Sequence, residues 1–326
     1  MFRAILLSLA MGIAPFHATA QVCGTEDLIA QLTPEERARL DALVAPHPFG
    51  EGLLFRADKG EDSVVVAGTL HIPDPRLAGL VDQVRPFLEE ADVLILEASA
   101  EDEAGLQRLA TVKPEMFFIT EGPTLIDLLS PEDWALVTDR LQALGIPSFL
   151  AAKFRPWYLS MTLAIPPCAM TLLQTGETGL DRRLEIIALE KGVALQTLDD
   201  TEALLRIFAD EPMDKQLDGL KVTLGMQQDG DAVTSTLIEG YFDGRVRETW
   251  EFARIQLDRS GIEDGEEMFE EINQALLVDR NAGWEARLPE MIAGQDAVIA
   301  VGAAHLSGET GVLRALERMG YEVSPL

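Results

Sequence analysis

Continuous apolar runs, each about as long as one strand, recur along this chain and end at polar or glycine residues. The runs "SVVVAG" (63–68), "DVLILEA" (92–98) and "VIAVG" (298–302) are typical of strands that are buried on both faces. Between the first two, residues 75–91 carry apolar side chains three and four positions apart, which is the spacing of an amphipathic helix. Residues 63–98 therefore predict a βαβ unit with a right-handed crossover.

Helix-start signals and turn residues place the other elements around this unit. Thr33, Pro34 and Glu36 have the types preferred at the N-cap, N1 and N3 of a helix, which should extend to Val44. "LLFRAD", "KGED" and "SVVVAG" follow one another from residue 53 and predict a β-hairpin. Further expected elements are helices over 130–145, 179–192, 281–293 and 309–320, strands over 193–198, 296–302 and 321–326, and several helices between 199 and 278.

This succession of elements predicts an α/β fold. We expect a mixed, largely buried sheet with flanking helices and a large helical middle segment. Residues 21–326 contain no repeat, no low-complexity run and no linker, so we expect one domain over that range.

The first twenty residues have the pattern of a Sec-type signal peptide. An apolar stretch follows Arg3, and residues 18–20 form an A-x-A cleavage site. The stretch is shorter than the roughly 20 apolar residues of a membrane span, although a short membrane anchor is the alternative. We expect cleavage before Gln21 and export, with the periplasm as the destination.

The charge balance restricts the classes of partner. The chain has 26 Lys and Arg residues against 55 Asp and Glu residues, a formal net charge of −29. Such an acidic protein is repelled by nucleic acids and by anionic membranes, which are themselves polyanionic. We therefore expect no nucleic-acid partner. The short apolar stretch near the N-terminus predicts no stable membrane span, and the substrate would be a peptide or a small molecule. The oligomeric state has no sequence signal.

The only two cysteines are Cys23 and Cys168. An even count in an exported protein favours a disulfide between them. Two free structural thiols are one alternative, and a nucleophilic Cys168 is another. No His, Lys or Asp flanks Cys168 to lower its pKa, which makes the nucleophile the weakest of the three.

Two of the four histidines follow a buried strand in the same way, as the last residue of Gly-x-x-His. These are Gly68, Thr69 and His71 in "GTLH", and Gly302 and His305 in "GAAH". Ligands of open α/β sheets bind at the carboxyl ends of parallel strands, where both motifs and the strand-end Glu97 should lie.

Two imidazoles and a carboxylate are a common set of ligands for a divalent metal ion. We expect His71, Glu97 and His305 to hold such an ion, with Mn²⁺, Co²⁺ or Zn²⁺ as candidates. The alternative is that both histidines are hydrogen-bonded structural residues.

Other polar residues are candidates for the same site. Arg280 could face an oxyanion or a substrate carboxylate, and Asn281 could donate into the site or serve as a helix N-cap. Asp181 could cap its helix or point into the site, whereas Trp284 is expected in the core. The chain lacks Gly-x-Ser-x-Gly, Walker A, Gly-x-Gly-x-x-Gly and His-Glu-x-x-His motifs, which disfavours the enzyme classes that depend on them.

Several segments resemble the TraB/GumN family, whose members are similar to animal Tiki metalloproteases and, more distantly, to erythromycin-esterase and ChaN-like proteins. They are "GTLHIPDPR" (68–76), "ADVLILEAS" (91–99), "GLDRRLEIIALEKG" (179–192), "DRNAGW" (279–284) and "AVGAAHLSGETGVLRALERMGYEV" (300–323). One departure is Leu198-Asp199, where many relatives have Leu-Glu, which leaves the role of Asp199 open.

The resemblance implies an α/β core in which both Gly-x-x-His motifs converge and, by analogy with Tiki, metal-dependent peptide hydrolysis. We therefore expect a metal-dependent hydrolase in which Glu97, Arg280 and Asn281 take part in catalysis. Gly68, Thr69, Asp181 and Gly302 would support the ligands from behind. The alternatives are a periplasmic metal- or haem-binding protein without turnover, and an accessory factor in envelope polysaccharide export.

Overall fold

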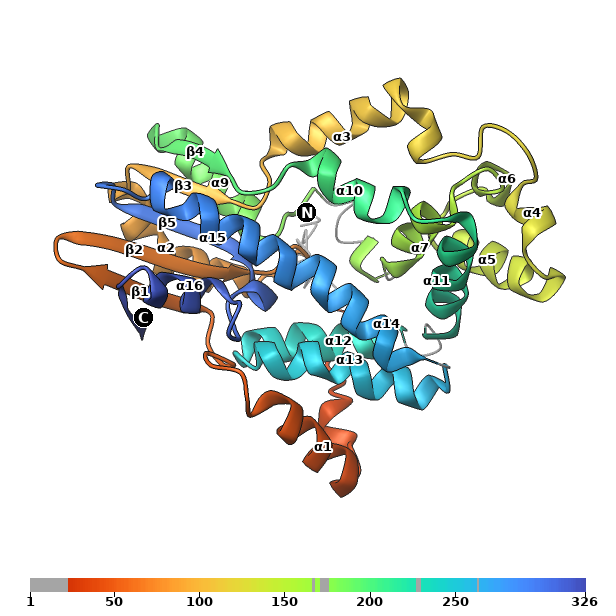
Figure 1. Ribbon diagram of the computed structural model, residues 1–326, viewed down its shortest axis with the longest axis horizontal. Helices are drawn as coiled ribbons and strands as arrows, with labels where there is room; N and C mark the ends of the chain where they lie inside the picture. The colour runs from red at the N-terminus through yellow and green to blue at the C-terminus, as the bar shows by residue number, and fades with distance from the viewer. Residues whose placement is uncertain (1–22, 166–167, 171–175, 227–229, 263) are drawn as a thin grey trace, which may run out of the picture.

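A computed structural model describes residues 23–165, 168–170, 176–226, 230–262 and 264–326, and the predicted signal peptide lies outside them (Figure 1). A mixed six-stranded sheet has the order β4-β3-β5-β2-β1-β6. The strands are β1 (Leu54–Lys59), β2 (Asp62–Thr69), β3 (Val93–Leu96), β4 (Ala194–Thr197), β5 (Ala297–Gly302) and β6 (Glu322–Pro325). The predicted α/β class, with its mixed sheet and flanking helices, is confirmed.

The strand register brings three strand ends to one edge of the sheet. Strands β2, β5, β3 and β4 are parallel, whereas β1 is antiparallel to both β2 and β6. Ile299 of β5 aligns with Val66 of β2 on one side and with Ile95 of β3 on the other. The predicted βαβ unit is present, but its two strands are not neighbours because β5, from the far end of the chain, lies between them.

Two pairs of helices cover the two faces of the sheet (Figure 1). Helices α2 (Leu77–Glu90) and α9 (Leu180–Lys191) pack their leucines on one face, and α15 (Asp279–Met291) and α16 (Val312–Arg318) cover the other. The central strands are therefore buried on both sides, which is why their sequences are continuously apolar.

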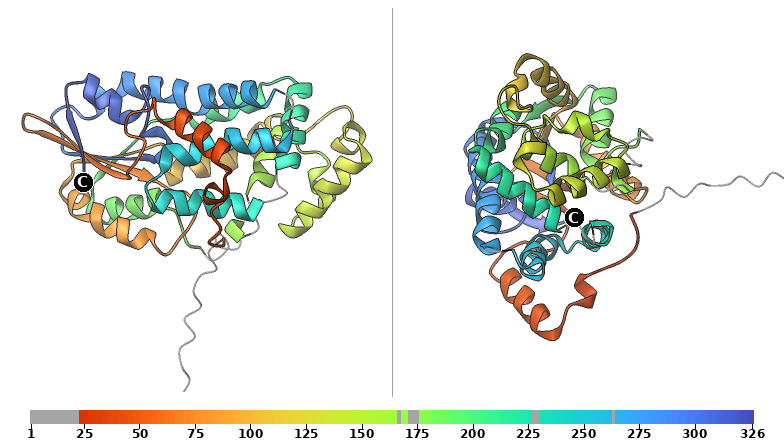
Figure 2. Two further views of the ribbon diagram at one scale, coloured as in Figure 1. Left: turned by 90° about the horizontal axis from the view of Figure 1, so that it is seen from below. Right: turned by 90° about the vertical axis from the view of Figure 1, so that its right-hand side faces the viewer.

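The remaining helices extend the molecule beyond the sheet, and those labelled α4 to α7 and α11 lie at its far end (Figures 1 and 2). They have an apolar cluster of their own, to which α5, α7 and α11 contribute. The bounds are α1 (Pro34–Val44), α3 (Ala100–Val112), α4 (Leu125–Leu128), α5 (Pro131–Ala143), α6 (Ser148–Ala151), α7 (Pro156–Ala164), α10 (Thr201–Ala209), α11 (Met213–Met226), α12 (Gly230–Phe242), α13 (Val246–Ser260) and α14 (Gly265–Asn273). The large helical middle segment was predicted.

Short irregular turns also occur among the described residues. They are the 3₁₀ turns η1 (Ile29–Gln31), η2 (Pro114–Met116) and η5 (Ala303–His305), and the π-helical turn η4 (Gln274–Val278). The turn η4 joins α14 directly to α15, so that the three segments form one continuous helical rod. Single π turns inside helices occur frequently at functional sites.

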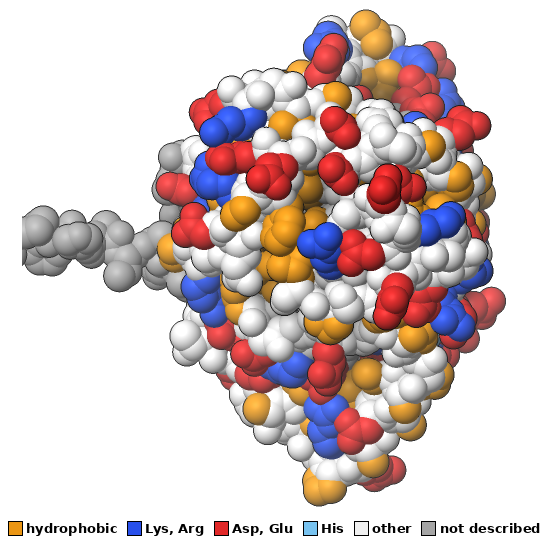
Figure 3. All heavy atoms as spheres, turned by 90° about the vertical axis from the view of Figure 1, so that its left-hand side faces the viewer, with side chains coloured by type: hydrophobic (Ala, Val, Ile, Leu, Met, Phe, Trp, Pro, Cys, Tyr) orange, Lys and Arg blue, Asp and Glu red, His pale blue; other side chains and the backbone are white. Residues whose placement is uncertain are grey.

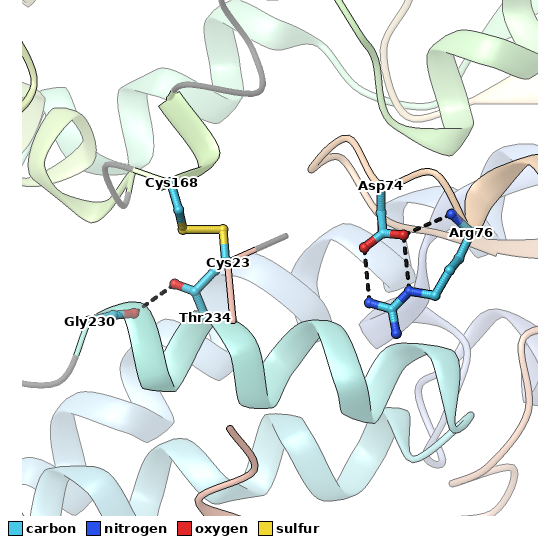
Figure 4. Close-up of a disulfide and its surroundings, with 6 residues drawn as sticks. All are labelled: Cys23, Asp74, Arg76, Cys168, Gly230 and Thr234. Carbon is cyan, nitrogen blue, oxygen red and sulfur yellow. Dashed lines mark hydrogen bonds and ion pairs between the residues drawn. A yellow bond between two sulfur atoms is a disulfide. The ribbon is translucent and has the colours of Figure 1, made fainter. Parts of the chain in front are cut away.

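The expected bond between Cys23 and Cys168 is present, with the two Cα atoms 5.2 Å apart (Figure 4). It joins the segment before α1 to the segment after α7. The bond closes a loop with a sequence separation of 145 residues. Restricting so long a loop in the unfolded chain stabilises the fold by about 5 kcal/mol in the chain-entropy account.

The surface carries both acidic and basic side chains. On the face at the sheet end of the molecule, acidic and basic side chains are interspersed (Figure 3). Among the described residues, none of the helices combines the length and the apolar character that a membrane crossing needs.

Candidate active site at the sheet edge

The candidate residues lie at the carboxyl ends of three parallel strands. Glu97 directly follows β3, His71 lies two residues beyond β2, and His305 ends the η5 turn that follows β5. A Cβ atom placed on Gly302 would lie 3.6 Å from His305 Cδ2 and 3.8 Å from His71 Nε2. The two ring atoms are therefore no farther apart than the sum of these distances, although their positions in the sequence differ by more than two hundred residues.

Glu97 is held on both oxygens. Its Oε1 accepts a hydrogen bond of 2.5 Å from the backbone N–H of Gly302, and its Oε2 accepts one from Arg280. A side chain on Gly302 would come within 3.0 Å of Oε1, so glycine leaves room for this carboxylate. Burial alone would raise the pKa of Glu97. The nearby charges of His305, Arg280 and His71, together with the Gly302 N–H, outweigh burial and lower the pKa to about 2.

His305 is buried, with only 5% of its side chain exposed. Its Nδ1 lies 2.7 Å from Oδ1 of Asn281, whose Nδ2 donates to the His305 carbonyl at 3.5 Å. Because an amide oxygen only accepts, Nδ1 carries the proton and Nε2 is left as an acceptor. Arg280 Nη1 donates to that Nε2 at 2.9 Å. Burial lowers the pKa of His305 to about 4, so the ring is neutral at pH 7.

His71 differs in exposure and in partner. Its side chain is 63% exposed, and its Nδ1 lies 3.2 Å from Oδ1 of Asp181 on α9. The Asp181 carboxylate raises the pKa of His71 above its ordinary value. The ring therefore has its Nδ1 toward α9 and its Nε2 toward Gly302 and the sheet edge.

Arg280 lies at the centre of the polar contacts. Besides Glu97 and His305, its guanidinium donates to both oxygens of Asp199, at 2.6 and 3.4 Å, and to the carbonyl of Leu276 at 3.2 Å. These contacts account for all five N–H donors of the guanidinium. Leu276 belongs to the π turn η4, so this irregular turn helps to fix the arginine.

Two helix-cap alternatives are wrong. Asn281 is the third residue of α15 and follows a continuous helical rod, so it caps nothing and instead orients His305. The N-cap of α9 is Gly179, and Asp181 faces His71 from the first turn. Trp284 lies in the core as expected, where its ring centroid is 4.4 Å from that of His305.

Comparison with known protein families matches residues 53–325 to the TraB/PrgY/gumN family. The chain belongs to the TraB/PrgY/gumN family. The matched range includes both Gly-x-x-His motifs, Glu97 and α15, and therefore every residue of the cluster described above. A search of curated proteins found no relative that matches the chain.

Sequence reasoning left two residues near the candidate site of this TraB/PrgY/gumN family member without a role. Asp199, left without a role, is fixed by Arg280 and by the indole N–H of Trp284 at 2.7 Å. Glu185 is buried and accepts the Ala100 backbone N–H, which anchors the loop after Glu97. The sequence signal for Asp199 is its place two residues beyond β4, at the same edge of the sheet as Glu97, whereas nothing local distinguishes Glu185.

The expected supporting residues lie close to the motif histidines. Tyr241 donates a buried hydrogen bond of 2.8 Å to the carbonyl of Gly68. Thr69 pairs through its backbone with Gly302, and its buried Oγ1 has no hydrogen-bond partner among the described residues. The end of β2 is thus held by a hydrogen bond from α12.

Two imidazoles and a carboxylate are residue types that bind divalent metal ions. His305 has its Nδ1 hydrogen-bonded to Asn281, as metal-binding histidines in proteins usually do, and His71 has its Nδ1 3.2 Å from a carboxylate oxygen of Asp181. Across the described residues, however, no three His, Cys, Asp or Glu side chains are spaced to hold an ion. The Arg280 guanidinium contacts two of the expected donors, Glu97 and His305.

Proposed function

We propose that this member of the TraB/PrgY/gumN family is an exported, metal-dependent hydrolase whose substrate is a peptide. His71, Glu97 and His305 would hold the ion at the carboxyl edge of the sheet. The observation that carries the proposal is the orientation of the two imidazoles. Asp181 lies 3.2 Å from Nδ1 of His71, and Asn281 is hydrogen-bonded to Nδ1 of His305, so both Nε2 atoms are directed at the region around Glu97 and Gly302.

A bound divalent ion would supply a water molecule whose pKa is lowered to about 7. The protein groups would do the rest. Glu97 remains ionised at neutral pH because its pKa is lowered to about 2, which suits a ligand and makes it a weak base. Asn281 keeps the proton of His305 on Nδ1. Arg280 places a fixed positive charge beside the carboxylate, where negative charge would develop during attack on a carbonyl.

The second candidate is metal binding without turnover. It is favoured by the contacts of Arg280, since all five of its N–H donors are directed at protein acceptors and none is left for a substrate oxyanion. A hydrolase would have to turn at least one of these donors to the substrate, whereas a binding protein has no oxyanion to stabilise.

The test of metal binding is isothermal titration of metal-free protein, made without a His-tag, with Mn²⁺, Co²⁺ and Zn²⁺. We expect binding to wild type and a loss of affinity of at least about 100-fold in His305→Ala and in His71→Ala, because each loses one ligand. The matched control is His47→Ala, since His47 contacts Arg247 outside the site. Equal binding by wild type and His305→Ala would refute the metal site.

The test of turnover is cleavage of a library of internally quenched peptides. Cleavage that a chelator stops, and that His305→Ala lacks, would support the hydrolase. Metal binding by wild type with no cleavage of any library member would favour the binding protein instead.

Sequencing the N-terminus of protein recovered from a periplasmic extract tests the export part of the proposal, which expects Gln21 as the first residue.

A further inference from the structure

The loop between β2 and α2 carries His71 between two apolar residues that face the other way. Leu70 and Ile72 are half-buried and pack against an apolar cluster, whereas the His71 side chain is 63% exposed. Where two side chains that flank a residue rest on one surface, the side chain between them points away from it, as in a strand. The cluster surrounds the disulfide and consists of Cys23, Ile165, Cys168, Ala169, Ile238 and Phe242.

Helix α12 holds both ends of this loop. Tyr241 donates a buried hydrogen bond of 2.8 Å to the carbonyl of Gly68, just before the loop. At the other end, the guanidinium carbon of Arg76 lies 4.0 Å from the ring centre of Phe242, and its Nη1 is 3.0 Å from Glu239. The loop is therefore attached at both ends to the C-terminal turn of α12.

The disulfide joins two segments that pack around the same helix. Cys23 precedes η1 and Cys168 follows α7, and Figure 4 shows their bond beside α12. The segment after Cys23 contacts α12 through the N–H of Leu28, which donates a buried hydrogen bond of 2.9 Å to Thr236 Oγ1. The bond therefore closes the cluster from two distant parts of the chain, directly beneath the neighbours of the motif histidine.

We infer that the Cys23–Cys168 bond positions His71, because it fixes the apolar cluster on which both neighbours of that histidine rest. Oxidation of the two thiols thus completes this half of the site. Closing the bond takes one electron and one proton from each thiol, and a disulfide of an exchange partner accepts them and becomes two thiols. Disulfides persist in oxidising compartments, so the loop would be fixed after export. The link to export rests on the proposed function, whereas the positioning of His71 requires neither a bound ion nor turnover.

The other half of the site is held by a different part of the fold. His305 contacts Asn281, Arg280 and Trp284, all on α15, and none of these three belongs to the cluster around the disulfide. Loss of the bond should therefore loosen the loop of His71 and leave the surroundings of His305 unchanged. This difference separates positioning from general stabilisation, since a bond that acts only on the unfolded chain protects all parts of the fold alike.

The experiment is hydrogen exchange of the full mature chain, read by NMR at two backbone amides. The first is the Leu180 N–H, which donates to the Leu70 carbonyl at 3.0 Å and reports on the loop. The second is the Asp199 N–H, which donates to the Glu97 carbonyl at 3.0 Å and reports on the rest of the sheet edge. The ratio of their exchange rates cancels any change in the stability of the whole fold.

In Cys23→Ser/Cys168→Ser, we expect Leu180 to exchange at least about tenfold faster relative to Asp199 than it does in wild type. Reduction of wild type with dithiothreitol should reproduce this change, and reoxidation should reverse it. A ratio that stays the same, whether both amides exchange faster or neither does, would show that the bond does not position the loop and would overturn the inference.

A second comparison keeps the bond and covers the case in which the double variant does not fold. Ile238→Ala removes a side chain of the cluster that is 1% exposed, and should raise the same ratio at least about fivefold. The matched control is Val233→Ala on the same helix, since Val233 packs against the separate cluster to which Leu40 and Phe252 belong. Equal ratios in these two variants would overturn the inference.

Discussion

The two Gly-x-x-His segments have the same sequence pattern and the same place in the sheet, yet their histidines have opposite electrostatic character. His305 is buried, its partner is a neutral amide, and its pKa is lowered to about 4. His71 is mostly exposed, its partner is the carboxylate of Asp181, and its pKa is raised. The motif places a ring at the sheet edge, and the helix packed beside that ring determines its charge.

The helices that supply the partners come from opposite faces of the sheet. Helix α9, which carries Asp181, packs with α2, whereas α15, which carries Asn281, packs with α16. The site therefore combines one imidazole that is fixed as a neutral acceptor with one that is positively charged when no ion is bound.

The largest expected difference between the two segments is in stability. His305→Ala should lower the free energy of unfolding by about 2–4 kcal/mol, because it leaves a cavity and an unpaired Asn281 oxygen. His71→Ala should lower it by less than about 1 kcal/mol, because most of that ring is in water. Urea unfolding followed by circular dichroism, with the disulfide intact, measures both. Equal losses of free energy in the two variants would contradict the greater structural role of His305.

The pH dependence of stability should differ in sign between the two histidines. The pKa of His305 is lower in the folded protein, so the stability it contributes is complete above about pH 6.5 and is lost as the pH falls toward 4. That contribution is about 3 kcal/mol. The pKa of His71 is raised, so its contribution is complete below about pH 6.5 and is lost as the pH rises through the folded pKa.

The measurement for this second prediction is the free energy of unfolding of wild type, His305→Gln and His71→Gln between pH 4 and 9. Each variant is compared with wild type at the same pH, so that the many carboxylates common to all three proteins cancel. His305→Gln should lose less free energy of unfolding than wild type as the pH falls. His71→Gln should lose less than wild type as the pH rises, and this second difference should be the smaller one. If the free energies of unfolding of the three proteins change in parallel between pH 4 and 9, the pKa directions of both His305 and His71 are contradicted.

The smallest expected effects come from exchanging the partners. Asn281→Asp places a carboxylate beside His305 Nδ1 and should raise the pKa of that ring by about one unit or more. Asp181→Asn should lower the pKa of His71 toward 6.5. Nitrogen-15 NMR of the imidazoles reads both values and the tautomers. Shifts of the same sign in the two variants would show that the partners do not determine the difference.

Much of the fold could be predicted because its signals are local. The capping box of Thr33 and Glu36, the hairpin, the buried strands and α2 all follow from short windows of sequence. The insertion of β5 between β2 and β3 could not be predicted, since the three strands have similar apolar sequences and each would bury equally well beside either of the others.

The same limit applies to the candidate site. The sequence pointed to His71, Glu97 and His305 because each follows a strand. It could not tell which of two neighbouring aspartates enters the site: Asp200 caps α10, whereas Asp199 turns to Arg280. Side chains of consecutive residues point in different directions, and only the packed neighbours determine which direction leads to a partner.

The sequence by itself determined where strands end, that a glycine precedes each histidine by three positions, and that two cysteines were available for one bond. Only the tertiary structure decided which group faces each ring. Asp181 and Asn281 reach His71 and His305 because α9 and α15 pack at a particular register on opposite faces of the sheet. That register follows from the fit of many apolar side chains at once, and no short segment of the chain contains it.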